Sequence, residues 1–381
     1  MAPKVLITGG AGFIGTHLAR ELLRRGCDVT VLDNFNPQIH GSAQTLPPDL
    51  ASAARLVRGD VRDEAVWLSA LPQQDCVVHL AAETGTGQSM YSTTHYEQVN
   101  IGGTALLCDL LAQPAGSSVQ RLVIASSRAI YGEGAYLCAQ HGIVYPAPQT
   151  AAAKSAGCFD PVCPHCSSTC TPTATPETAP LHPTSFYGTT KQSQEEIALR
   201  FATAHGLPAI ALRYQNVYGP GQSLHNPYTG ILAIFSNLAR AGQPLEVFED
   251  GQESRDFVFV IDAVLATADS VTDTLQAQRA LNIGSGARTS LLELATAINA
   301  FHGSKSTVRV SGRFRDGDIR HALADLTQAH RLLTYEPATT LTDGLHRFLT
   351  WAAESAPQDE SAAAAHTRSL DELRKHGLLH G

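Results

Sequence analysis

The stretch TGGAGFIG, from Thr8 to Gly15, decides the fold of this 381-residue chain. It follows a short β-rich run at 5–8 and precedes a segment with helical spacing at 13–25. Its spaced glycines allow a tight turn, a close approach of the backbone to a pyrophosphate, and close packing of a helix on a strand. The stretch therefore predicts a strand, a glycine turn and a helix whose N-terminus can bind phosphate.

The segment after this helix strengthens the prediction of a dinucleotide site. A second strand is expected at 29–32, and Asp33 stands at its end. A carboxylate in that place can hold both ribose hydroxyls and would repel a 2′-phosphate, which favours NAD over NADP. Asp60, with Val61, follows the apolar pair at 56–57 and either hydrogen-bonds the adenine edge or caps a turn.

Strands that alternate with helices continue along the first half of the chain, which predicts a Rossmann-type, doubly wound parallel sheet of the α/β class. We assign residues 1–212 to this domain and 213–381 mainly to a smaller C-terminal α+β lobe that binds substrate, with some segments returning to the sheet. From 354 onward we expect a peripheral helix or a frayed tail. The further expected elements are strands at 76–80, 122–125 and 209–214 and helices at 103–111 and 185–204.

The composition excludes several classes of partner. The formal net charge is -8, so the chain is a poor ligand for nucleic acid or an anionic membrane surface, and a phosphate-bearing ligand must be met by a local set of donors. The first apolar run is broken at once by glycines, unlike a signal peptide, and no stretch resembles a spanning helix. We expect a soluble cytoplasmic protein.

A phenol and an ammonium group stand four residues apart in the sequence YGTTK, from Tyr187 to Lys191. On a helix they share one face, where the cation is expected to lower the pKa of the phenol. Such a phenol can take the proton of a sugar hydroxyl during hydride abstraction, and the lysine can also reach the nicotinamide ribose. Ser126 and Ser127 follow a predicted strand at its carboxyl end, where open α/β sheets bind ligands.

At this point the chain resembles the extended short-chain dehydrogenase/reductase family of nucleotide-sugar epimerases and dehydratases. The resemblance rests on TGGAGFIG, ASSRAIYG, YGTTK, RYQNVYGPGQ, SRDFVFVID and NIGSG. It implies a homodimer and a triad of Ser127, Tyr187 and Lys191. It also implies NAD contacts by Gly9, Gly12, Phe13, Ile14, Gly15, Asp33, Asn34, Asp60, Val61, Leu80, Ala81, Ala82, Asn100, Tyr187 and Lys191. Contacts with a nucleotide sugar are implied for Thr86, Ser127, Arg128, Asn216, Arg255, Arg315 and Asp318.

The residues after the triad serine narrow the reaction. Dehydratases of the family carry Asp-Glu there and related decarboxylases a nearby Glu, whereas this chain has Arg128 and Ala129. The resemblance therefore implies a 4-epimerase that works through a 4-keto sugar, and it looks closest to the dTDP-L-rhamnose 4-epimerase branch. A UDP-hexose 4-epimerase and an NAD(P)H-dependent ketoreductase are the alternatives, with a non-catalytic NAD-binding regulator behind them.

Five cysteines crowd into a Pro-rich insert at about 133–183, which we expect to be a long loop without regular structure. Cys163 and Cys166 form a knuckle-type pair, and Cys138 and His141 have the same spacing. Two such pairs can complete a tetrahedral structural zinc site. Two further thiols could replace His141, and unliganded reduced thiols are the alternative. The spare thiols are those of Cys158 and Cys170.

Overall fold

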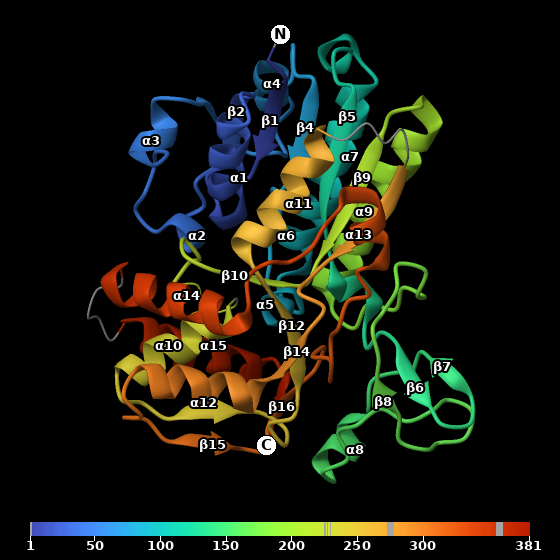
Figure 1. Cartoon of the computed structure of the whole chain (residues 1–381), viewed down its shortest axis with the longest axis vertical. Helices are drawn as coiled ribbons and strands as arrows, with labels where there is room; N and C mark the ends of the chain where they lie inside the picture. The colour runs from blue at the N-terminus through green and yellow to red at the C-terminus, as the bar shows by residue number, and fades with distance from the viewer. Residues whose placement is uncertain (1, 225, 227, 229, 273–277, 356–360) are drawn as a thin grey trace.

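The computed structural model describes residues 2–224, 226, 228, 230–272, 278–355 and 361–381. A seven-stranded sheet in which every strand pair is parallel forms its centre (Figure 1). Its order is β13-β9-β5-β4-β1-β2-β3. The strands are β1 (Lys4–Thr8), β2 (Asp28–Asp33), β3 (Arg55–Arg58), β4 (Cys76–His79), β5 (Arg121–Ser127), β9 (Ala209–Tyr214) and β13 (Gln278–Ile283).

The prediction of a doubly wound α/β sheet is confirmed. After β3 the chain returns to the other side of β1, so the strand order reverses between β1 and β4, and ligands bind at such a reversal outside the carboxyl ends of the strands. The edge strand β3 was missed as a strand because most of its residues are exposed, which leaves only a short apolar signal. Strand β5 is longer than the strand predicted at 122–125. It begins one residue earlier, at Arg121, and continues through both serines, Ser126 and Ser127.

Helices cover both faces of the sheet. Successive β1 residues alternate between two cores, with Ile7 packed with Leu18 of α1 and Leu6 packed with Ala198 of α9. No helix in the described part of the chain is long and apolar enough to cross a membrane. The covering helices are α1 (Phe13–Arg24) and α11 (Val260–Thr272) on one side and α4 (Glu64–Ala70), α7 (Gly103–Leu111) and α9 (Phe186–His205) on the other.

A second lobe lies below the sheet in Figure 1 and includes the chain's C-terminal segment. That segment is not a frayed tail. Its last strand pairs antiparallel with β16, and Leu373 of its helix α15 is buried; residues 356–360 lie outside the described part. The lobe contains α10 (Ile231–Arg240), α12 (Leu291–Phe301), α14 (Leu341–Ser355), α15 (Ser361–Lys375), β10 (Asn216–Tyr218), β11 (Leu245–Val247), β12 (Ser254–Phe259), β14 (Arg288–Ser290), β15 (Val308–Val310), β16 (Phe314–Arg315) and β17 (Leu379–His380).

The cysteine-rich insert has regular structure, so the expectation of a structureless loop was wrong. It forms a small antiparallel sheet in the order β7-β6-β8, at the lower right of Figure 1. Strands this short carry little periodic signal, and prolines obscure it further. Its elements are β6 (Tyr136–Cys138), β7 (Gly142–Val144), α8 (Ala151–Ser155) and β8 (Thr171–Pro172). The remaining short elements of the chain are α2 (Pro37–His40), α3 (Pro48–Ala51), α5 (Thr86–Ser89), α6 (Thr93–Tyr96), η1 (Glu97–Gly102), η2 (Pro114–Gly116), η3 (Arg128–Tyr131) and α13 (Thr327–Leu333).

A buried ion pair fastens α9 to the sheet. The guanidinium of Arg213 on β9 donates from Nε and Nη2 to the carboxylate of Glu195 on α9, and both side chains are almost fully buried. Ser126 on β5 donates to the same carboxylate, and Arg213 also donates to the hydroxyl of Tyr131. Glu195 therefore connects α9 with two neighbouring strands.

We expect Glu195→Ala to destabilise the protein by about 3–5 kcal/mol, because it leaves the guanidinium of Arg213 buried without its counter-charge. Urea unfolding measures the change. The neighbour Glu196, whose side chain is 45% exposed, is the matched control, and Glu196→Ala should cost less than about 1 kcal/mol. Equal effects of the two substitutions would contradict this role of the pair.

Candidate active site

A cleft of about 940 Å³ opens along the carboxyl ends of the parallel strands and continues into the second lobe. Residues of the predicted cofactor site and of the predicted substrate site line this one cleft. Among the predicted residues outside the cysteine insert, Asn100 alone does not line it. The predicted residues that do are Gly9, Gly12, Phe13, Ile14, Gly15, Asp33, Asn34, Asp60, Val61, Leu80, Ala81, Ala82, Thr86, Ser127, Arg128, Tyr187, Lys191, Asn216, Arg255, Arg315 and Asp318.

The glycine turn leaves the N-terminus of α1 open to the cleft. Gly9 has a φ of 65°, and a Cβ atom there would lie 2.9 Å from the backbone nitrogen of Ala81. A Cβ on Gly15 would collide with the carbonyl oxygen of Gly9. Gly12 caps α1 without a side-chain hydrogen bond, so the helix presents its first N–H groups to the cleft. This arrangement fits a pyrophosphate.

Asp33 lies beside this turn at the end of β2 and is almost fully buried. Its carboxylate accepts hydrogen bonds from the backbone N–H groups of Ala11 (3.0 Å) and Phe35 (2.8 Å). The ring of His40 lies 3.3 Å away, a neighbour that the sequence did not indicate because α2 is a single short turn. The carboxylate is thus held in place next to the phosphate-binding turn, as ribose binding requires.

Asp60 is a turn cap in this structure. Its carboxylate accepts hydrogen bonds from the backbone N–H and the Nε of Arg62 and from the Nδ2 of Asn34. The guanidinium of Arg62 is the main reason that the pKa of Asp60 falls to about 2. Asp60 also lines the cleft, so the contact with the adenine edge stays a prediction beside this role as a cap.

Asn100 stands behind the wall of the cleft. It is fully buried, its Oδ1 accepts from the backbone N–H of Glu83, and its Nδ2 donates to the Glu83 carbonyl and to Thr190. Asn100 thus holds the backbone of Glu83, which itself lines the cleft, and the cofactor contact expected of Asn100 stays a prediction.

The two serines at the end of β5 point in opposite directions. Ser126 donates to the buried Glu195, whereas the hydroxyl of Ser127 accepts from the backbone N–H of Ala129 and lies close enough to the Tyr187 phenol to lower its pKa. Alternation along a strand accounts for the difference. Lys191 follows one turn after Tyr187 on α9, and its Nζ donates to the carbonyl of Ala125 and to Gln194, both at 2.8 Å. The predicted triad therefore gathers at one place in the cleft.

Burial is the main cause of the pKa shifts of Tyr187 and Lys191. It raises the pKa of Tyr187, and the hydrogen bond with Ser127 acts in the opposite direction. It also lowers the pKa of Lys191 to about 7. The expectation that Lys191 brings the pKa of the phenol below its usual value was wrong for the protein alone, because the desolvation of Tyr187 outweighs the neighbouring groups.

Three arginines lie at the substrate end of the cleft. Arg128 is half-buried, and the loss of hydration together with the nearby charge of Arg255 lowers its pKa to about 10. Arg315 forms an ion pair with Asp318 at 2.8 Å. An anion bound beside Arg128 and Arg255 would relieve their mutual repulsion, so this end of the cleft favours a phosphate-bearing ligand although the whole chain is acidic.

Sequence reasoning missed other residues of the cleft. Glu253 is buried there, and burial raises its pKa to about 7. Among the residues that the structure describes, amide atoms of Gln215, Gln222 and Asn226 are buried in the cleft wall without a hydrogen-bond partner. Only Gln215 and Gln222 fall within a motif quoted for the resemblance, and nothing in the sequence marked them as ligand-facing.

The two predicted metal-ligand pairs come together away from the cleft lining. The ligand atoms of Cys138, His141, Cys163 and Cys166 all lie within 4.8 Å of one another. Cys158 is exposed, and the thiol of Cys170 donates to the carbonyl of Ser168.

Comparisons with known proteins agree with this geometry. Residues 5–284 match the NAD dependent epimerase/dehydratase family. The chain is 41% identical to dTDP-L-rhamnose 4-epimerase of Burkholderia thailandensis, over 92% of this chain and 95% of the relative. It resembles the structure of UDP-glucose 4-epimerase from Thermotoga maritima with UDP-glucose (TM-score 0.73, 28% identity, covering 92% of this chain and 99% of the other). It also resembles the complex of Thermus thermophilus UDP-glucose 4-epimerase with NAD (TM-score 0.72, 25% identity, covering 93% and 100%).

We expect Ser127→Ala to move the acid limb of the kcat/KM profile to higher pH. The Ser127 hydrogen bond lowers the pKa of Tyr187, so its loss raises that pKa and reduces the phenolate fraction at any given pH. Activity should therefore recover, relative to wild type, as the pH increases. Ser126→Ala is the matched control, because it removes a bond to Glu195 and should leave the limb in place. A uniform loss of activity at every pH in Ser127→Ala would contradict this role.

Proposed function

Because the chain belongs to the NAD-dependent epimerase/dehydratase family, we propose that it is a nucleotide-sugar 4-epimerase that inverts C4 through a transient 4-keto sugar. One observation carries the proposal. The phenol of Tyr187 and the hydroxyl of Ser127 lie close together in a cleft that also contains the glycine turn and the arginine cluster, which we define as Arg128, Arg255 and Arg315. A sugar carbinol held there lies between a nicotinamide site and a diphosphate site.

The residues present fit NAD. The open N-terminus of α1 suits its pyrophosphate, and the fixed carboxylate of Asp33 suits a ribose with two free hydroxyls. NAD, when bound, supplies the acceptor for the C4 hydride and then returns it. Because the cofactor ends the cycle in its starting state, the enzyme should need no second substrate to regenerate it.

The chain's own residues handle the proton and the position of the sugar. Tyr187 takes the O4 proton as the carbinol is oxidised and gives it back on reduction, while Ser127 hydrogen-bonds to the same oxygen. Lys191, held by Ala125 and Gln194, stands on the same face of α9 as the phenol. The arginine cluster holds the diphosphate while the 4-keto sugar turns to present its opposite face.

The residues around the serine explain why the proposed reaction stops at C4. Arg128 and Ala129 follow Ser127, and neither can act as the acid or base that removes water from a neighbouring carbon. Among the described residues that line the cleft, none belongs to the cysteine insert, so we assign that insert no chemical step.

The favoured substrate is a dTDP-6-deoxyhexose such as dTDP-L-rhamnose, which would place the enzyme in carbohydrate biosynthesis. The support is the 41% identity to dTDP-L-rhamnose 4-epimerase over nearly the whole of both chains. UDP-hexoses are the alternative, since several similar proteins are UDP-sugar epimerases. The cytoplasmic location and the homodimer stay predictions.

The deciding experiment follows a C4-deuterated nucleotide sugar by NMR with pure protein and no added cofactor. We expect interconversion of the C4 epimers with deuterium kept at C4, because the hydride leaves and returns within one site. dTDP-L-rhamnose and UDP-glucose are compared side by side to identify the base and sugar. Conversion only after NADH or NADPH is added, with stoichiometric consumption of that cofactor, or replacement of the C4 deuterium by solvent hydrogen, would contradict the proposal.

We expect Tyr187→Phe to lower kcat by about 10²–10⁴-fold, because the O4 proton loses its acceptor. The control is Tyr131→Phe, which removes another buried hydroxyl, one that bonds to Asn282 and Arg213. That variant should lose stability and keep its turnover. Similar turnover in wild type and Tyr187→Phe would contradict the role of Tyr187 as the proton acceptor, and no turnover in wild type would favour a non-catalytic role for the protein.

A further inference from the structure

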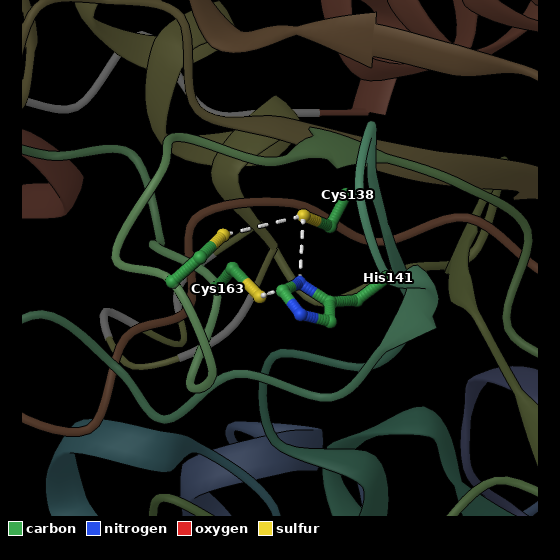
Figure 2. A group of neighbouring side chains, drawn as sticks. Cys138, His141 and Cys163 are labelled. Carbon is green, nitrogen blue, oxygen red and sulfur yellow. Dashed lines mark hydrogen bonds between the residues drawn. The ribbon is translucent and has the colours of Figure 1, made fainter.

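The insert between Ser127 and Tyr187 contains a compact group of three thiols and one imidazole that the proposed reaction does not use. Figure 2 shows Cys138, His141 and Cys163 pointing toward one another. The sulfurs of Cys138 and Cys163 both approach the Nδ1 atom of His141. Cys138 comes from strand β6 and His141 from the turn that follows it. Cys163 and Cys166 come from the loop after α8, so two separate segments converge.

The distances within this group match the edges of a tetrahedron around zinc. Zn–S bonds of about 2.3 Å and a Zn–N bond of about 2.0 Å place two sulfurs about 3.8 Å apart, and a sulfur and a nitrogen about 3.5 Å apart. The sulfurs of Cys138 and Cys166 are 3.7 Å apart. The Nδ1 of His141 is 3.6 Å from the Cys138 sulfur and 3.5 Å from the Cys163 sulfur. Thiol hydrogen bonds could produce any one of these distances, but they do not require all four ligand atoms to lie within 4.8 Å of one another, as they do here.

Backbone groups support sulfur ligands of this kind. The N–H of His165 points at the Cys163 sulfur at 3.4 Å, as expected of a knuckle in which the chain folds back over a thiolate. Cys138 and Cys166 do not form a disulfide, because their sulfurs are much farther apart than the S–S bond length of about 2.05 Å. The geometry thus presents three sulfurs and a nitrogen as separate ligands.

The part of the insert around the four ligands has only a small apolar core. Its hydrophobic cluster consists of Tyr136, Val144 and the cysteines themselves. Large apolar side chains of the same segment face outward instead, with Leu137 at 49% and Ile143 at 59% exposed. A unit that buries so little apolar surface needs a covalent or metal staple to keep one structure.

We propose that Cys138, His141, Cys163 and Cys166 bind one structural zinc ion. Three thiolates and an imidazole are a closed set of the type that structural zinc prefers, with no position left for water or substrate. Binding releases the thiol protons and changes no oxidation state. The ion joins segments that are 28 residues apart in the sequence, from Cys138 to Cys166.

The proposed ion stabilises the part of the chain that docks the insert on the second lobe. Lys154 of α8 is buried and donates to Glu249 at 2.8 Å, and Asp160 accepts from the guanidinium of Arg320. Arg320 also pairs with Glu249, so one buried network joins the insert to that lobe. Both insert residues lie between the two ligand pairs, where release of the metal would free the loop.

The first test is the metal content of the full-length wild-type protein, purified without chelator and measured by mass spectrometry. We expect one zinc per chain, and tetrahedral absorption bands with sulfur-to-metal charge transfer after exchange with Co²⁺. Iron in place of zinc, a disulfide, or metal-free protein whose clustered thiols react with Ellman's reagent would overturn the proposal. This test depends on no substitution and is independent of epimerase activity.

Variants then locate the ligands. Cys163→Ser should lose most of the zinc, whereas His141→Cys should keep it as a four-cysteine site. Cys170→Ser is the matched control, since Cys170 is equally buried in the same cluster but bonds to the Ser168 carbonyl. We expect it to retain zinc and to resist proteolysis of the insert like wild type. Zinc loss in Cys170→Ser, or full zinc in Cys163→Ser, would contradict the assigned ligand set.

Discussion

The packing of α9 against β5 and β9 is the constraint on which the rest of the active site depends. Glu195 joins this helix to Arg213 and Ser126, which sit on the two strands. Tyr187 stands eight residues earlier on the same helix, a little over two turns, so any rotation or shift of α9 would move its phenol away from Ser127. A buried ion pair contributes little net stability, but it permits few alternative arrangements, and here it sets the register between the helix and the sheet.

The local charges along the cleft explain how an acidic protein can bind a diphosphate. The overall charge of -8 belongs to the whole chain, whereas Arg128 and Arg255 both line the cleft and lie close enough for the charge of Arg255 to lower the pKa of Arg128. Desolvation and then their repulsion lower the pKa of Arg128, and a bound anion would relieve the repulsion. At the other end of the cleft the open N-terminus of α1 provides a second anion site without any charged side chain. Tyr187 lines the same cleft, and in the proposed function the reacting sugar carbon lies beside it.

The cysteine insert lies between the serine and the tyrosine of the proposed triad in the sequence. A loop of that length would allow β5 and α9 to move independently if their own contacts did not hold them. The structure instead gives the insert a small sheet, and ties it to the second lobe through Lys154, Asp160 and Arg320. The insert is thus attached at its outer part to the lobe that carries Arg255, and a metal at its centre would make that attachment rigid.

The sequence by itself determined the features that depend on near neighbours in the chain: the glycine turn before α1, Asp33 at the end of β2, and Tyr187 with Lys191 on one helical face. It also placed two ligand pairs with metal spacing, because each pair lies within a few residues. Tertiary structure alone decided that Asn100 supports Glu83 instead of lining the cleft, and that Glu253 lies buried among the arginines. It alone decided that burial raises the pKa of Tyr187. These outcomes depend on desolvation and on contacts between distant segments, and neither leaves a periodic or local pattern in the sequence.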